Sequence, residues 1–124
     1  MWAIKTTDRF DRWFTTRCDS DRASILAALI ALQERGPGLP RPWANTIRGS
    51  RFINMKELRI QCRGHPVRAF FAFDPERTGV VLCAGDKTGN EKRFYDEMIP
   101  VADREFARWL DNLKQKESQG GQNA

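Results

Sequence analysis

Basic side chains are concentrated in one stretch of this sequence, and they are its first candidates for chemistry. Residues 41–68 hold seven basic residues against one acid, a net charge of +6, whereas the whole chain of 124 residues carries +5. The seven are Arg41, Arg48, Arg51, Lys56, Arg59, Arg63 and Arg68. Such a segment favours a polyanionic partner, most simply a nucleic acid, because each phosphate that a cation neutralises releases condensed counterions. A basic face kept only for solubility is the alternative on composition alone.

Side chains that titrate near neutrality are scarce. The single histidine, His65, lies between Gly64 and Pro66, which predicts a surface turn rather than a catalytic acid. The three cysteines are an odd count without CxxC spacing, so we expect reduced thiols and no zinc site. Residues 86–89 (Asp-Lys-Thr-Gly) lack the spacing of a P-loop, and the sequence predicts neither a metal nor another cofactor.

Two consecutive helices are predicted near the N-terminus, after a short strand at residues 2–5. Residues 8–16 carry Phe10, Trp13 and Phe14 at helical spacing, and a second helix is expected between the cap signal at 19–21 and Gly36. The apolar side chains of the second helix are Ile25, Leu26, Leu29, Ile30 and Leu32. These helices are expected to form an αα hairpin.

The period of the apolar residues changes to two after the basic segment begins. Alternation at 57–63, 67–73 and 80–84, with turns between, predicts an antiparallel meander. One face of this sheet is expected to pack on the helical hairpin. The other is expected to expose Arg59, Gln61, Arg63, Arg68 and Phe70. A basic face with an aromatic side chain can hold phosphates and stack a base.

A glycine-bracketed loop at 85–90 is predicted to place cations and aromatics beside the sheet edge. A final helix is expected over 101–114, and the polar residues 115–124 are expected to be disordered. The sequence therefore predicts one domain at residues 1–114. It has neither a signal peptide nor an apolar run long enough to cross a bilayer, which predicts a cytoplasmic protein.

Four motifs in order carry a family resemblance: residues 54–59 (NMKELR), 68–74 (RAFFAFD), 85–90 (GDKTGN) and 94–100 (FYDEMIP). Across residues 2–113 the chain resembles the phage-derived HigB-like branch of the RelE/ParE toxin superfamily. The resemblance implies an α+β fold, an N-terminal αα hairpin packed on a small antiparallel sheet with a C-terminal helix. It also implies a type II toxin that is held inactive by a cognate helix-turn-helix, HigA-like antitoxin and reaches operator DNA only through that complex.

The activity implied by the resemblance is ribosome-associated, metal-independent cleavage of messenger RNA. A ribose 2′-hydroxyl attacks the adjacent phosphate, which requires a proton acceptor and positive charge on the phosphorane. Lys56 is the candidate base, or a solvated lysine in the alternative. Arg59 and Arg68 are candidates to clamp the phosphate, unless they form salt bridges with Glu57 or Asp86. Tyr95 is a candidate to stack on a base or donate its proton, unless it packs the last helix on the core.

A second set of side chains is expected to bind the RNA around the catalytic group. The set consists of Arg51, Arg63, Phe70, Lys87, Lys92, Arg93 and Phe94. For Phe70, burial under the final helix is the alternative. Two other functions remain open at this point. A ParE-like, non-enzymatic gyrase poison would act through the hairpin and show an apolar sheet face, and a nucleic-acid-binding module would lack catalysis.

Overall fold

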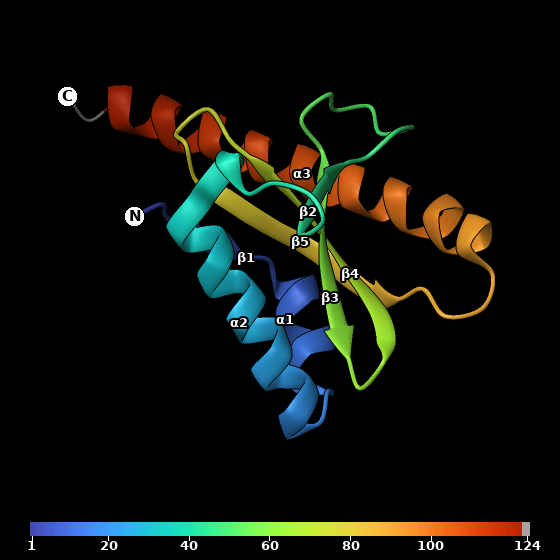
Figure 1. The fold of residues 1–124 in the computed structure, drawn as a ribbon. Helices are drawn as coiled ribbons and strands as arrows, with labels where there is room; N and C mark the ends of the chain where they lie inside the picture. The colour runs from blue at the N-terminus through green and yellow to red at the C-terminus, as the bar shows by residue number, and fades with distance from the viewer. Residues whose placement is uncertain (123–124) are drawn as a thin grey trace.

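A five-stranded mixed sheet forms the centre of the molecule (Figure 1). The computed structural model describes residues 1–122, and of residues 118–122 it describes only the backbone. The strands are β1 (Ile4–Thr6), β2 (Ala44–Thr46), β3 (Lys56–Cys62), β4 (His65–Phe73) and β5 (Gly79–Asp86). Their order across the sheet is β1-β5-β4-β3-β2, with β1 parallel to β5 and the other neighbours antiparallel. The predicted meander is therefore confirmed as β3-β4-β5.

Helices cover both faces of this sheet. They are α1 (Asp8–Thr15), α2 (Asp19–Arg35), the short 3-10 helix η1 (Gly36–Gly38) and α3 (Glu91–Gln122). The Thr7 hydroxyl accepts a hydrogen bond from the Phe10 amide at 3.2 Å and caps α1. Gly36 ends α2 with φ +58°, and a Cβ there would lie 2.5 Å from the Trp2 ring. The αα hairpin and the α+β fold class are confirmed.

The two faces of the sheet bury separate apolar clusters. On one face Phe10, Ile25 and Leu32 from the hairpin pack against Leu58 and other residues of β3, β4 and β5. On the opposite face, side chains that include Phe70, Leu82 and Met55 pack beneath Ala102 and Phe106 of α3. In Figure 1 the hairpin and the long α3 accordingly lie on either side of the sheet. The second face, predicted to be open, is thus covered by α3 over much of its area.

The last helix is longer than predicted at both ends. It begins at Glu91 rather than near Val101, and it contains Pro100. Apolar side chains at helical spacing continue on both sides of this proline, and their burial on the sheet outweighs its lost hydrogen bond. The structure describes the backbone of 115–122 as helical, where the sequence predicted a disordered tail, and the last residues of that tail, 123–124, lie outside the described part.

Two further points complete the comparison with the predicted elements. Of the apolar side chains expected on the second helix, Leu26 and Ile30 are exposed. The strand β2 was not predicted, because three residues are too few to show a period. Within residues 1–122, no helix combines the length and the apolar character that a membrane span requires.

Candidate functional site

A buried carboxylate, Glu57, lies at the centre of the candidate site. Glu57 is 3% exposed, and its Oε1 accepts a hydrogen bond of 2.5 Å from the Tyr95 hydroxyl of α3. Nε of Arg68 lies 3.6 Å from the same oxygen, and Nε of Arg59 lies 3.6 Å from Oε2. Two arginines and a tyrosine from three different elements therefore converge on one carboxylate.

The strand register explains this convergence. Glu57 and Arg59 lie two residues apart on β3, so both project toward the face covered by α3. Arg68 stands directly opposite Arg59 on β4. Two guanidinium groups facing each other across a strand pair repel, and the Glu57 carboxylate between them offsets that repulsion. The three charged groups thus form one electrostatic unit.

One N–H group of the Arg68 side chain makes no hydrogen bond within residues 1–117. Its side chain is 8% exposed, and one terminal nitrogen donates to the Val67 carbonyl at 3.0 Å. Its buried Nε–H has no hydrogen-bond acceptor among the described residues. Buried donors are nearly always hydrogen-bonded. Here Oε1 of Glu57 lies 3.6 Å from this nitrogen, an ion-pair distance, so the group balances the charge of the carboxylate.

Tyr95 is held in its protonated form. Burial, together with the hydrogen bond to Glu57, raises the pKa of Tyr95 to about 12. Nζ of Lys87 lies 5.8 Å from the centre of the tyrosine ring and 2.9 Å from a carboxylate oxygen of Glu91. The phenol is therefore a hydrogen-bond donor to Glu57 throughout the physiological pH range.

These residues open into a groove of about 390 Å³, which we call the Glu57 groove. Glu57, Arg59 and Tyr95 line it from β3 and α3, and Arg41 and Arg48 line it from the segment around β2. The groove therefore combines a recessed carboxylate with several guanidinium groups, the combination that can hold a phosphodiester and accept the proton of the neighbouring ribose 2′-hydroxyl.

Lys56, the predicted catalytic base, does not join this cluster. It lies on the other face of β3, where its Nζ donates to the Pro37 carbonyl at 3.3 Å. Lys56 is therefore separated from Arg59 and Arg68, which leaves it poorly placed to act as the base. Both arginines form the ion pairs with Glu57 that were expected as the alternative, and Arg59 still lines the groove. Tyr95 does reach the site, although it was expected to act on RNA directly.

Three members of the predicted RNA-binding set lie elsewhere. Arg63, in the β3–β4 turn, forms two hydrogen bonds of 2.8 and 3.0 Å with the carboxylate of Asp21 in α2, an ion pair that lowers the pKa of Asp21. Phe70 is fully buried beneath α3. Phe94 is half-buried, and its ring centre lies 6.0 Å from that of Phe70. These two aromatic side chains belong to the core and are not available for base stacking.

The remaining predicted cations lie around the groove and along α3. Lys87 stands beside Tyr95, and Arg51 lies over the Phe52 ring at 5.2 Å. Lys92 and Arg93 are exposed and form i,i+4 ion pairs with acids of α3. His65 is half-exposed at the start of β4, the surface position predicted for it.

Glu57 is the candidate residue that sequence reasoning missed, since it entered only as a salt-bridge partner. The signal was present in the alternation of β3, which places Glu57 with Arg59 and Lys56 with Leu58. Among the side chains of residues 1–117, no three from His, Cys, Asp or Glu group as metal ligands, and the three cysteines are free thiols.

Comparisons with known proteins agree with this architecture. Residues 12–107 match the family described as "Phage derived protein Gp49-like (DUF891)". The chain is 42% identical over 108 residues to "Putative toxin HigB3" of Mycobacterium tuberculosis, covering 87% of this chain and 93% of that protein. It is also 42% identical over 104 residues to "Putative toxin HigB2" of the same organism, covering 83% of this chain and about half, 52%, of that longer relative.

Solved structures with a similar fold include the free Escherichia coli toxin RelE in a doubly substituted form. That structure has a TM-score of 0.56 at 16% identity, covering 86% of this chain and 96% of RelE. The RelE–RelB complex of Pyrococcus horikoshii gives 0.52 at 11% identity, covering 70% of this chain and 96% of its match. The chain therefore has a RelE-like fold, is homologous to the HigB proteins, and belongs to the phage-derived Gp49-like family.

Proposed function

We propose that this chain is the toxin of a type II toxin–antitoxin pair and that it cleaves messenger RNA on the ribosome in the cytoplasm. One observation carries the proposal: a buried carboxylate flanked by Arg59, Arg68 and Tyr95 at the base of a basic groove. The names of its M. tuberculosis relatives support the toxin role. A charged groove in place of an apolar sheet face favours RNA chemistry over a gyrase-binding role.

The proposed reaction uses Glu57 as the proton acceptor. The 2′-oxygen of a ribose forms a bond to the adjacent phosphorus, and its proton passes to the Glu57 carboxylate. Arg59 lines the groove and stabilises the negative charge on the phosphorane, and the buried Arg68 adds positive charge beside Glu57. The bond from phosphorus to the 5′-oxygen then breaks, and that oxygen takes a proton from water. The products are a 2′,3′-cyclic phosphate and a 5′-hydroxyl.

Tyr95 acts through Glu57 in this scheme. The attacking and leaving oxygens lie on opposite sides of phosphorus in an in-line displacement. The Tyr95 hydroxyl lies 2.5 Å from Glu57, so the two groups meet the phosphate from the same side. Tyr95 therefore cannot serve the leaving oxygen while Glu57 serves the attacking one. We assign it as a positioning residue that orients the carboxylate.

The test of the function is to induce this chain alone in bacteria and map messenger RNA 5′ ends, with a plasmid-supercoiling assay in parallel. The proposal predicts new cuts inside reading frames that disappear when translation is blocked. Intact messages with altered supercoiling would instead identify a gyrase poison. Growth without arrest would leave a nucleic-acid-binding module as the better description.

A cognate antitoxin completes the proposal. Similar folds have been crystallised as toxin–antitoxin complexes, including the intact E. coli RelBE complex, whose match has a TM-score of 0.52 at 17% identity and covers 68% of this chain and 95% of the solved one. We expect a small helix-turn-helix protein encoded beside this chain to bind it and restore growth on co-expression. Growth arrest that persists despite equal expression of that neighbour would contradict the pairing.

A further inference from the structure

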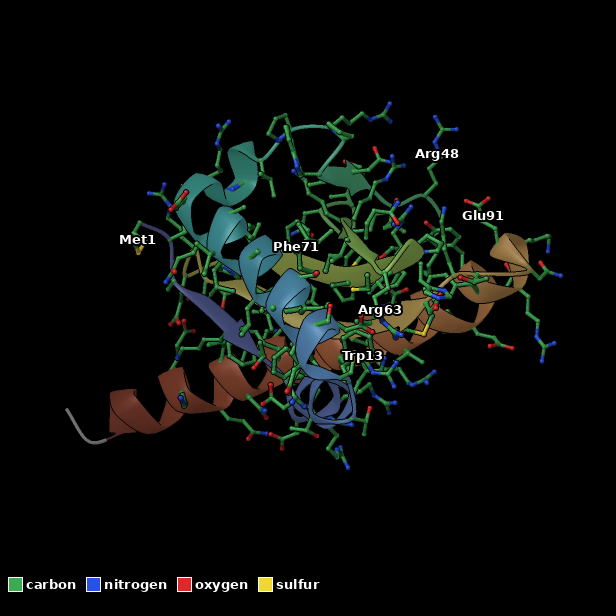
Figure 2. All side chains as sticks on the ribbon, turned by 60° about the horizontal axis from the view of Figure 1, so that its bottom comes forward. Met1, Trp13, Arg48, Arg63, Phe71 and Glu91 are labelled. Atoms are coloured by element: carbon green, nitrogen blue, oxygen red, sulfur yellow. The ribbon has the colours of Figure 1, made fainter. Side chains whose placement is uncertain are left out.

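A second hollow adjoins the Glu57 groove and contains no residue assigned to the reaction other than Tyr95. It measures about 530 Å³ and lies between residues 48–51 and the stretch of α3 from Lys92 to Arg104. We call it the Arg48 hollow. Arg48, Tyr95 and Ile99 line both this hollow and the Glu57 groove, so the two form one continuous depression. In Figure 2, Arg48 and Glu91 project at the same end of the molecule, at the opposite end from Met1.

The wall formed by residues 48–51 is fixed to α3. The buried carboxylate of Asp103 accepts hydrogen bonds from the Ser50 hydroxyl at 2.5 Å and from the Arg51 amide at 3.1 Å. The next residue, Phe52, packs edge-on against Phe106 with ring centres 4.9 Å apart. This loop is thus attached to the helix by polar and apolar contacts. The backbone that carries Arg48 and Arg51 is therefore held in place.

The charge of the Arg48 hollow is positive and largely uncompensated. Four basic residues line it, whereas its two acids are both engaged: Asp96 pairs with Lys92 at 2.8 Å, and Asp103 bonds the loop. Arg48 and Arg104 are exposed and form no ion pair within residues 1–117. Free guanidinium groups around a hollow favour a phosphate, which they can bind through two parallel hydrogen bonds.

We propose that the Arg48 hollow binds a phosphate of the RNA strand next to the one cleaved in the Glu57 groove. This inference rests on the proposed function and adds a second contact point for the same substrate. A strand that enters the Glu57 groove continues past Tyr95 and Ile99 into the hollow, because these side chains border both. Arg48 and Arg104 then determine affinity and the position of the strand, while Glu57 and its partners perform the chemistry.

The test compares two double variants that each remove two exposed cations. Arg48→Ala with Arg104→Ala alters the hollow, and Arg35→Ala with Lys114→Ala removes equal charge from α2 and the distal part of α3. The probe is an RNA oligonucleotide made uncleavable by 2′-O-methyl groups, and binding is followed by fluorescence anisotropy over a series of salt concentrations. Circular dichroism verifies that both variants fold.

The hollow variant is expected to bind this oligonucleotide about tenfold more weakly than the control variant does. Its slope of log affinity against log salt should fall by about 1. A dinucleotide, which reaches only the Glu57 groove, should lose less affinity in the hollow variant than the oligonucleotide does, because Arg48 lines the groove as well whereas Arg104 lines only the hollow. Equal loss in the two variants, or unchanged oligonucleotide binding by the hollow variant, would overturn the subsite.

Failure of the proposed function produces a different pattern. If the wild-type chain binds the oligonucleotide through the hollow but cuts no message on ribosomes, the cleavage proposal fails and the phosphate subsite stands. If the wild-type chain does not bind the free oligonucleotide, the subsite is overturned, while the cleavage proposal is decided by the cuts in messages on ribosomes.

Discussion

At the scale of single residues, the alternation of side chains along β3 determines which residue lies beside the arginines. Lys56 and Glu57 are adjacent, but neighbouring side chains of a strand point to opposite faces. The basic composition favoured Lys56 as the base, whereas the alternation of side chains along β3 separates Lys56 from Arg59. Which acid is buried among the arginines could not be predicted, because it depends on contacts with β4 and α3 that are distant in the sequence.

Arg59 offers the cleanest test of the phosphate clamp. Removing Arg68 would leave the buried Glu57 with less compensation and destabilise the fold, but Arg59 is exposed enough for its loss to be tolerated. We predict that Arg59→Ala slows RNA cleavage by about 10²- to 10³-fold. The matched control, Lys56→Ala, removes an equal charge from the other face and should leave cleavage nearly unchanged. Single-turnover cleavage on ribosomes measures both, and a large loss in the Lys56 variant would restore that residue as the base.

The pKa of Tyr95 is directly measurable, since it is the only tyrosine. Ultraviolet absorbance of the phenolate should show a midpoint near 12 in the folded protein, against 10 for a free phenol. A folded pKa above the unfolded one means that the stability contributed by Tyr95 is fully present below pH 10 and is lost as the pH rises through 12. Denaturant titrations should show this loss in the wild-type chain and not in Tyr95→Phe. A midpoint near 10 would mean that the hydroxyl is free of Glu57.

At the scale of elements, the patterns predicted the hairpin and the meander, whose apolar periods are long and regular. They failed at α3, which was predicted to begin near Val101 and begins at Glu91, and at β2, which is defined by its partner strand rather than its own residues. They also could not show that the β3–β4 turn contacts α2. These points depend on contacts between distant segments. Such contacts pair Arg63 with Asp21 and bury Phe70, two residues that were predicted on the RNA surface.

Arg63 is predicted to be structural. Arg63→Ala should lower the melting temperature, because it leaves the Asp21 carboxylate on α2 without its partner, while ribosomal cleavage by the folded protein is unchanged. The pKa of Asp21 is lowered in the folded state, so this contribution is present above its ordinary value of 3.8 and is lost as the pH falls through the folded value. Thermal melts should therefore show a smaller difference between the two proteins in acid. A cleavage defect at full stability would return Arg63 to the RNA surface.

Pro100 destabilises α3 locally, because a proline inside a helix removes a backbone hydrogen bond. Pro100→Ala restores a backbone donor inside the helix and should raise the free energy of unfolding by about 2 kcal/mol. Urea denaturation measures this change. Unchanged or reduced stability would indicate that the helix needs the proline at this position.

At the scale of the whole molecule, contrary to the prediction, the basic residues of segment 41–68 do not all lie on one face of the sheet. Lys56 and Arg63 turn to the hairpin side, and Arg68 is buried beside Glu57. The basic surface that remains borders the Glu57 groove and the Arg48 hollow, between the β2 segment and α3. The family resemblance predicted this α+β arrangement, whereas the site depends on side-chain contacts that no single segment contains.

The most direct test of the central claim is the chemistry of the RNA ends left by the wild-type chain and by Glu57→Gln on translating ribosomes. Glutamine keeps the shape of the side chain and can still accept the Tyr95 hydrogen bond, but it cannot take a proton. We predict 2′,3′-cyclic phosphate and 5′-hydroxyl ends from the wild-type chain, and cleavage slower by about 10²- to 10⁴-fold from the folded variant. Undiminished cleavage by Glu57→Gln, or 5′-phosphate ends from the wild-type chain, would contradict the account.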